Sequence, residues 1–383
     1  MKHIVHILRG ILCALIFVLV LELCARTDDV LSYGAPFWGP YNNEILLKTD
    51  NLGKWGKPGA RYEKWQLNSL GYRGPELQPG TVRIVCFGAS ETFGLYEAPD
   101  EEYPRQLERE LNKLAGKPEF QVVNAAFPGE TLPTAILRVP EVVSQIHPSY
   151  ALIYPSPATY IEITPRSVSP ARAPRPESLD DRILELRISE RVGNLLKSAL
   201  PKAVQTMLRQ FQIERDTTHV RVMQTLPEAN VERFREDLGA LVKSLRAHGV
   251  EPVLVTHATI FGSALTPEDR DLLIEWRKFY PILEEGGFID MERRMNQAIR
   301  ETAACEKLYL IDAANEIPPG PEYFADMVHF TTSGAEIMAA DLAVGLKPVL
   351  FPQTYGKNLA PSAGRSPASI GCRSSARLGV SNR

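Results

Sequence analysis

Two distant stretches of this chain hold residues whose types and spacing suit nucleophilic catalysis. Ser90 follows the apolar run 84–87 and two small residues. Asp326 and His329 lie three residues apart, so on one helical turn their side chains point the same way and the carboxylate can hydrogen-bond to the imidazole Nδ1. His329 then presents Nε2 as a base, which Ser90 needs because a hydroxyl is a poor nucleophile at neutral pH. These residues predict a catalytic triad of Ser90, Asp326 and His329.

The stretch around Ser90 predicts a strand, a tight turn and a helix. Residues 84–87 are apolar and partly β-branched, which is typical of a buried strand, and apolar residues recur at helical spacing over 103–114. In parallel α/β sheets the chemistry lies at the carboxyl ends of strands, where the hydroxyl of Ser90 would be free of the sheet. The alternative is a turn of small residues that only packs closely.

Strand and helix patterns alternate through the rest of the chain. Further strands are predicted at 150–154, 251–256 and 307–311, and helices at 134–144, 231–248 and 288–304. This order predicts an α/β, flavodoxin-like three-layer fold with a mostly parallel sheet of about five strands and helices on both faces.

Together the two stretches resemble the SGNH, or GDSL-type, hydrolase family. The sequence FGAS at 87–90 is similar to the family's Gly-Asp-Ser block, with Ala89 where the family usually has Asp. The family's last block, Asp-x-x-His followed by a Thr and a Gly, is matched by Asp326, His329, Thr331 or Thr332, and Gly334. The resemblance implies the SGNH version of the flavodoxin-like fold and a serine nucleophile.

The two middle blocks of the family bear on the oxyanion hole. The sequence VVNAAFPG at 122–129 is similar to the second block, which implies that the backbone N–H of Gly129 joins that of Ser90 in the hole. The third block is normally Gly-x-Asn-Asp, but residues 155–158 read Pro-Ser-Pro-Ala, so both the Gly and the Asn are missing. Ser156 or Thr159 is the alternative source of a side-chain donor.

The resemblance implies a serine esterase or deacylase, and we expect it to act outside the cytoplasm on an O-acyl ester, of a carbohydrate or lipid. Two alternatives stay open. An O-acyltransferase of cell-surface polysaccharide would use the same three residues with a sugar hydroxyl as acceptor. A catalytically lapsed SGNH-like scaffold in envelope biosynthesis would explain the missing third block.

The N-terminus predicts a membrane segment. Lys2 and Arg9 precede an uninterrupted apolar run at 11–21, and the apolar residues from Ile4 onward lengthen the segment enough to span a bilayer. Positive charge before the run favours a cytoplasmic N-terminus, which places the remainder outside the cytoplasm. The sequence NSLGYRGPE at 68–76 is similar to a segment of membrane-anchored bacterial members of the SGNH family, which implies that the membrane is a bacterial inner membrane. Residues 1–26 are therefore expected to be a signal anchor, with a signal peptide cleaved after Ala25 as the alternative.

The remaining segments differ in composition. Residues 27–80 are predicted to be an extended lead-in packed on the SGNH-like domain at 81–350. That domain would contain a proline- and arginine-rich and helical insertion at 162–228, and the tail at 351–383 is predicted to be disordered.

Composition offers no support for several other functions. The net charge of -3 gives no reason to propose nucleic acid, and the seven histidines are dispersed without metal-ligand spacing. No glycine-rich phosphate loop is present. No cofactor or metal is expected, the expected partners are an ester substrate and the membrane, and protein partners are not identified.

Overall fold

We describe the protein from a computed structural model, in residues 2–38, 43–162, 186–217, 222–262 and 264–352. The chain divides into two compact units. The first comprises Met1–Gly71 and Val168–Phe211, and the second comprises Tyr72–Ser167 and Gln212–Arg383. The predicted tail at 351–383 falls almost wholly outside the described residues, as does the proline- and arginine-rich part of the predicted insertion.

The second unit is built on a parallel sheet of five strands. Their order is β6-β5-β7-β8-β9, and each neighbouring pair is parallel. The strands are β5 (Val82–Gly88), β6 (Phe120–Asn124), β7 (Tyr150–Tyr154), β8 (Glu251–Val255) and β9 (Tyr309–Ile311). Numbered along the chain, this is the flavodoxin-like order 2-1-3-4-5, so the predicted fold class is confirmed.

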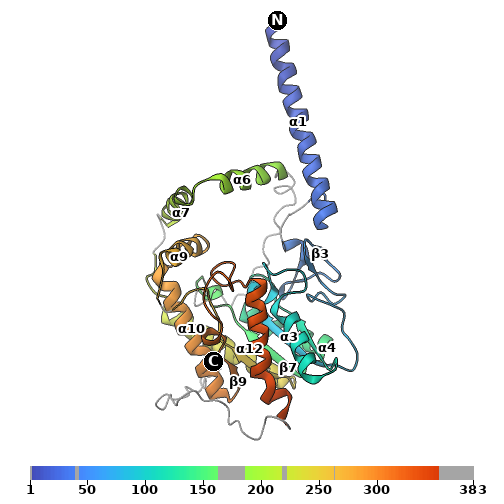
Figure 1. Cartoon of the computed structure of the whole chain (residues 1–383), viewed down its shortest axis with the longest axis vertical. Coiled ribbons are helices and arrows are strands. Elements are labelled where there is room, and N and C mark those ends of the chain that lie inside the picture. Colours follow the sequence, from blue (N-terminus) through green and yellow to red (C-terminus); the bar gives the residue numbers. More distant parts are fainter. Residues whose placement is uncertain (1, 39–42, 163–185, 218–221, 263, 353–383) are drawn as a thin grey trace, which may run out of the picture. The chain divides into compact units, whose positions relative to one another are not determined.

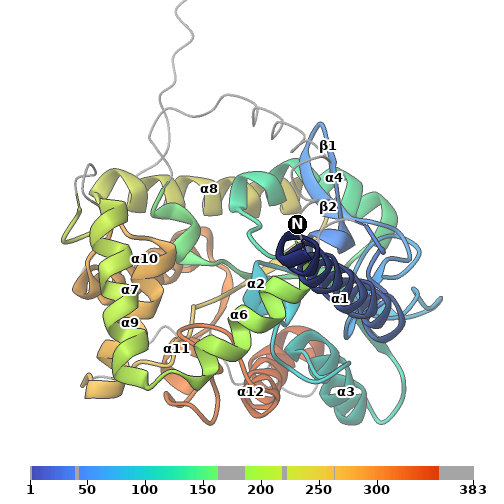
Figure 2. The same ribbon diagram turned by 90° about the horizontal axis from the view of Figure 1, so that it is seen from above.

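Helices cover both faces of this sheet. On one face α3 packs against α12, and on the other α8 packs against α4 and α10 (Figure 2). The helices of this unit, with the 3-10 helix η2, are α2 (Ser90–Phe93), α3 (Tyr103–Ala115), α4 (Leu132–Ile146), η2 (Pro157–Tyr160), α8 (Glu228–Ala247), α9 (Pro267–Phe279), α10 (Glu285–Glu306), α11 (Ala313–Glu316) and α12 (Thr332–Leu350).

The core between the sheet and the α3/α12 layer explains why the strands read as continuous apolar runs. Ile84 and Cys86 of β5 are fully buried against Leu107 and Leu111 of α3, in one cluster with Met338 of α12. Strands covered on both faces have no solvent side, so they lose the alternation of apolar and polar residues. The sheet is thereby a rigid platform for the loops at its carboxyl edge.

The first unit contains the N-terminal helix and two short hairpins. Helix α1 (Lys2–Tyr33) is long and apolar enough over Val5–Tyr33 to cross a membrane (Figure 1). The other elements are η1 (Asn43–Leu46), β1 (Leu47–Asp50), β2 (Gly53–Gly56), β3 (Arg61–Tyr62), β4 (Trp65–Gln66) and α6 (Arg187–Ala199). Helix α7 (Lys202–Thr217) begins in this unit and ends in the other.

Candidate active site

Ser90 opens the short helix α2 directly after strand β5. Two features of the turn require small residues: a Cβ added to Gly88 would lie 2.1 Å from Thr92 Oγ1, and Gly94 ends the helix with a φ of 86°. The backbone of Gly88 therefore passes too close to the following helix for any side chain. This is the physical reason for the small residues that the sequence shows before Ser90.

Two side chains from elsewhere hold the end of α2 in place. Arg73 donates to the carbonyls of Phe93 and Gly94, and its guanidinium pairs with Glu102 at 3.0 Å. Asn124, the last residue of β6, donates through Nδ2 to the carbonyl of Thr92 at 2.8 Å. A helix of four residues cannot satisfy its own last carbonyls, so these donors stabilise the element that presents Ser90.

Asp326 and His329 are hydrogen-bonded as predicted, but not on a helical turn. They lie in the loop before α12, and Asp326 Oδ1 also accepts the backbone N–H groups of Val328 and His329. The Nδ1 atom of His329 lies 2.9 Å from Oδ1 and 2.8 Å from Oδ2 of Asp326. The predicted helix was wrong because an aspartate that binds nearby backbone N–H groups stabilises a turn instead.

The other ring nitrogen of His329, Nε2, is buried but makes no hydrogen bond to the described residues. The ring of Tyr96 meets the imidazole edge to face, with 5.5 Å between ring centroids. Burial works against the charged imidazolium, yet the hydrogen bond to Asp326 and the charges of Glu91 and Glu97 raise the pKa of His329 overall. Asp326 thus orients the ring, and the Nε2 atom of His329 is left to accept a proton.

Ser90 itself is half-buried and bonds elsewhere. Its Oγ donates to Glu91 Oε2 over a long 3.4 Å, and no hydrogen bond between Ser90 and His329 occurs within the described residues. The two loops nevertheless meet, because the backbone N–H of Ala98 donates to Thr332 Oγ1 at 3.0 Å. The structure therefore brings the Ser90 segment and the His329 segment to one edge without a formed Ser–His bond.

A buried cluster of two glutamates and a histidine lies beside Ser90. His257, at the end of β8, is 1% exposed; its Nδ1 is 2.9 Å from Glu292 and its Nε2 is 3.4 Å from Glu91. Burial disfavours the charged ring, but the carboxylates of Glu292 and Glu91 raise the pKa of His257 to about 10. His257 is therefore an imidazolium between Glu91 and Glu292, although burial raises the pKa of Glu292 as well. Tyr154 stacks on the ring of His257, with 5.1 Å between ring centroids.

The two carboxylates that bind the ring of His257 come from distant parts of the chain. Glu91 lies 166 positions from His257 in the chain and Glu292 lies 35 positions from it. A signal was present only at Glu91, as an acidic residue directly after the predicted nucleophile.

The two hydroxyl groups of the third-block region are already engaged. Ser156 Oγ donates to Glu91 Oε1 at 2.8 Å, and Thr159 Oγ1 donates to the carbonyl of Ser156 at 2.8 Å. Pro157 begins η2 and has no N–H to offer. In this arrangement both hydroxyl protons are donated within the protein.

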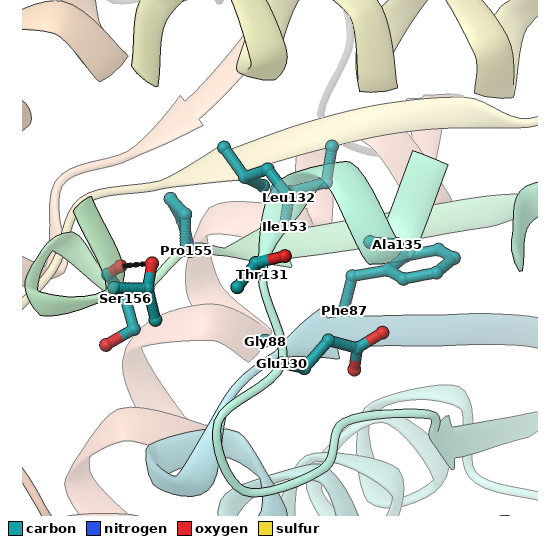
Figure 3. Close-up of a pocket in the computed structure, with 10 residues that line it drawn as sticks. Phe87, Gly88, Glu130, Thr131, Leu132, Ala135, Ile153, Pro155 and Ser156 are labelled. Carbon is teal, nitrogen blue, oxygen red and sulfur yellow. Dashed lines mark hydrogen bonds between the residues drawn. The ribbon is translucent and has the colours of Figure 1, made fainter. Parts of the chain in front are cut away.

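Gly129 lies in the loop before α4, exposed and with a φ of 76°. The same loop lines a pocket at the carboxyl end of β5 and β7 (Figure 3). The pocket is mainly apolar, and its lining includes Phe87, Gly88, Glu130, Thr131, Leu132, Ala135, Ile153, Pro155, Ser156 and Thr159. Burial raises the pKa of Glu130 to about 8, so its carboxyl is largely protonated at neutral pH.

Comparisons with known proteins find likeness in fold only. No family model matches the chain, and no curated protein matches its sequence. Similar solved structures include the lipase/acylhydrolase from Enterococcus faecalis, at 17% identity and a TM-score of 0.42 over 70% of this chain and 97% of that one. A GDSL-like lipase from Bacteroides thetaiotaomicron has 14% identity and a TM-score of 0.38, over 70% and 89% of the two chains.

An acetyl xylan esterase from Geobacillus stearothermophilus has 15% identity and a TM-score of 0.39, over 70% of this chain and 95% of that one. These identities and TM-scores are too low to indicate a substrate for this chain. The strand order of the sheet, with Ser90 and the Asp326–His329 pair at one edge, is observed in this chain itself. On that order, the chain has the flavodoxin-like fold that its resemblance to SGNH hydrolases implies.

Proposed function

We propose that the protein is an SGNH-type serine hydrolase that cleaves an O-acyl ester. The observation that carries the proposal is the vacant Nε2 of His329, buried and facing no partner among the described residues while Asp326 holds Nδ1. A buried polar atom without a partner costs free energy, so it is retained where a substrate or a moving side chain completes the bond. Ser90, at the same edge of the sheet, is the hydroxyl that would do so.

The chemistry follows from these positions. The Oγ of Ser90 turns from Glu91 toward His329, gives its proton to Nε2 and attacks the ester carbonyl. The bond to the alcohol breaks as His329 returns the proton to the departing oxygen. Water then attacks the acyl group, again with His329 as base, and the acid leaves while Ser90 is restored. Asp326 keeps the ring in the correct tautomer throughout.

The oxyanion of each tetrahedral intermediate would be bound by the backbone N–H groups of Ser90 and Gly129. Donors aimed at developing charge are usually the largest catalytic contribution, at about 100-fold to 1000-fold each. The absence of the third-block Asn therefore implies a slower enzyme than one with three donors. The imidazolium of His257 offsets the charge of Glu91, which would otherwise repel the oxyanion.

The substrate class is suggested by the pocket beside these donors. It adjoins all three blocks, through Gly88 near Ser90, Glu130 next to Gly129, and Ser156 itself. The cavity is only about 10 Å³, so it would take no more than the methyl group of an acetyl ester, and the alcohol, which we assign to a carbohydrate or lipid, would extend outward. With α1 as a single-pass anchor and the positive N-terminus in the cytoplasm, this chemistry would take place on the outer side of the inner membrane.

A fluorophosphonate probe and a short-chain aryl ester test the proposal in the full chain, reconstituted in lipid nanodiscs. We expect stoichiometric labelling and ester hydrolysis, both lost in Ser90→Ala. The matched control is Ser144→Ala, because Ser144 lies in α4 and its hydroxyl only donates to the carbonyl of Glu141. Labelling that persists in Ser90→Ala, or its absence from well-folded wild-type protein, would refute the proposed function.

A further inference from the structure

Helix α6 has an apolar side that is exposed in the structure. Leu195 is 69% exposed and Leu196 is 65% exposed, and Val192 lies on the same face by its spacing of three and four residues. A row of large apolar side chains in water is unfavourable, so such a face usually meets a partner. The question is which partner this helix faces.

The start of α6 is fixed to one level of α1. The backbone N–H of Ile188 donates to Glu22 at 3.0 Å, and Arg187 pairs with Asp29 at 2.6 Å. Arg191 pairs with Asp29 at 2.7 Å, and Asp29 is fully buried. These contacts lie within the first unit. They attach α6 to α1 by ion pairs and a hydrogen bond to Glu22 and Asp29, which lie two helical turns apart.

That level is where α1 changes from apolar to polar. Before it, the large apolar side chains from Val5 to Val20 are exposed, as expected for a surface that faces lipid. Glu22 is the first acidic residue of the helix and is buried against Arg26, at 2.6 Å. From Glu22 to Asp29 the helix rises about 10 Å, comparable to the thickness of one headgroup layer.

Two neighbouring features have the character of a membrane interface. Trp38 is exposed beside Arg26, whose guanidinium lies 4.7 Å from the centre of its ring, and tryptophan is enriched at the headgroup level. The part of α7 in the first unit repeats the apolar pattern with exposed Met207, Leu208 and Phe211. The apolar side of α6 therefore belongs to the same unit as the apolar surface of α1, and Figure 1 shows α6 directed crosswise to α1.

We propose that α6 lies in the headgroup layer of the membrane that α1 crosses, with Val192, Leu195 and Leu196 among the acyl chains. An amphipathic helix of this kind is buried by about 5–10 Å at the interface, which agrees with its attachment between Glu22 and Asp29. The second contact with lipid fixes the first unit against rotation about α1. The proposal depends on α1 as a membrane span and not on the ester chemistry.

Photo-cross-linking in the full chain tests this directly. The residue p-benzoylphenylalanine is placed at Leu195 or, as the matched control, at Gly193, where helical spacing turns a side chain away from the apolar side and an added Cβ would meet nothing within 4 Å. The protein is reconstituted in nanodiscs of phosphatidylethanolamine and phosphatidylglycerol, irradiated, and examined by mass spectrometry. We expect lipid adducts at position 195 in about tenfold excess over position 193, because only one side of an interfacial helix meets acyl chains.

Three results would overturn the proposal: a cross-link from position 195 to the sheet unit of the same chain, a cross-link to a second copy, or equal lipid adducts at both positions. A second measurement guards against a perturbing label. Hydrogen exchange of the α6 amides in nanodiscs should accelerate about tenfold when Leu195→Asp and Leu196→Asp are combined, since burial in the interface is then lost. Unchanged protection in that variant also contradicts the proposal.

Discussion

Ser156 Oγ donates a hydrogen bond to Glu91 Oε1 at 2.8 Å, which ties the third-block segment to the residue that follows the proposed nucleophile. Glu91 is 3% exposed and also faces the imidazolium of His257. Burial disfavours its charge, but the hydrogen bond and charge of His257, with a contribution from His329, lower the pKa of Glu91 to about 2. The charged carboxylate of Glu91 therefore binds the hydroxyl of Ser156, which the sequence had suggested as a donor to the oxyanion.

Replacing Ser156 by Ala is expected to reduce kcat by about tenfold or less, because a hydroxyl that donates to Glu91 is not a donor in the hole, where losses reach about 100-fold or more. Steady-state kinetics with an aryl ester measures the effect. Thr159→Val is the companion variant and should change kcat even less, since its hydroxyl only binds the Ser156 carbonyl. A 100-fold fall in kcat for Ser156→Ala at unchanged KM would instead assign Ser156 to the hole.

Replacing Glu91 by Gln should move the pH profile of kcat/KM to lower pH. Against the effect of burial, the hydrogen bond to Asp326 and then the negative charge of Glu91 raise the pKa of His329 above its ordinary 6.5, and the base must be neutral to accept the proton of Ser90. Activity therefore rises with pH through a raised pKa, and removing the charge lowers that pKa.

Glu97→Gln is the control for this experiment, because burial raises the pKa of Glu97 to about 7 and leaves it only partly charged in the working range. The pH profile of kcat/KM should therefore shift less in Glu97→Gln than in Glu91→Gln. A profile that stays in place in Glu91→Gln, with the fold intact by circular dichroism, would show that Glu91 does not set the basicity of His329.

His257→Gln should destabilise the protein by about 3–5 kcal/mol, because it leaves two buried carboxylates without their cation. The pKa of His257 is raised from 6.5 to about 10, so its contribution is complete below 6.5 and is lost as the pH rises through about 10. The gap in unfolding free energy between wild type and variant should therefore shrink toward pH 10.

Urea unfolding at several pH values measures this gap. His248→Gln is the matched control, because the ring of His248 is exposed and bonds to the Ser244 carbonyl, so the effect of the substitution should stay within about 0.5 kcal/mol. Equal stability of wild type and His257→Gln at neutral pH would mean that the histidine is not charged between the two glutamates.

Ala135→Leu should fill the small acyl pocket and lower activity on acetyl esters. Ala135 is buried in the pocket lining, so a larger side chain there should lower kcat/KM for an acetyl aryl ester by about tenfold. Leu137→Ala, on the exposed side of the same helix, is the control. An unchanged kcat/KM in Ala135→Leu would place the acyl group elsewhere.

The strands could be predicted from the sequence because short, continuous apolar runs are typical of strands that are buried on both faces of a sheet. The strand predicted at 150–154 is β7 in full, and the run 84–87 lies inside β5. The turn after β5 was also predictable, because the small residues 88–90 interrupt the apolar run. The structure gives the reason, since a side chain at Gly88 would collide with Thr92. The helical turn at Asp326 was wrong, because the spacing of two side chains does not reveal that one of them binds backbone N–H groups.

Sequence alone therefore determined the α/β order, the apolar N-terminal helix and the chemically capable residues at strand ends, since these depend on local pattern and periodicity. Tertiary structure decided what each polar group meets: Glu91 and Glu292 for His257, Glu91 for Ser156, and no described partner for His329 Nε2. Such contacts join residues far apart in the chain, and their distances are set by how the sheet and its covering helices pack. Spacing along the sequence carries no information about that packing.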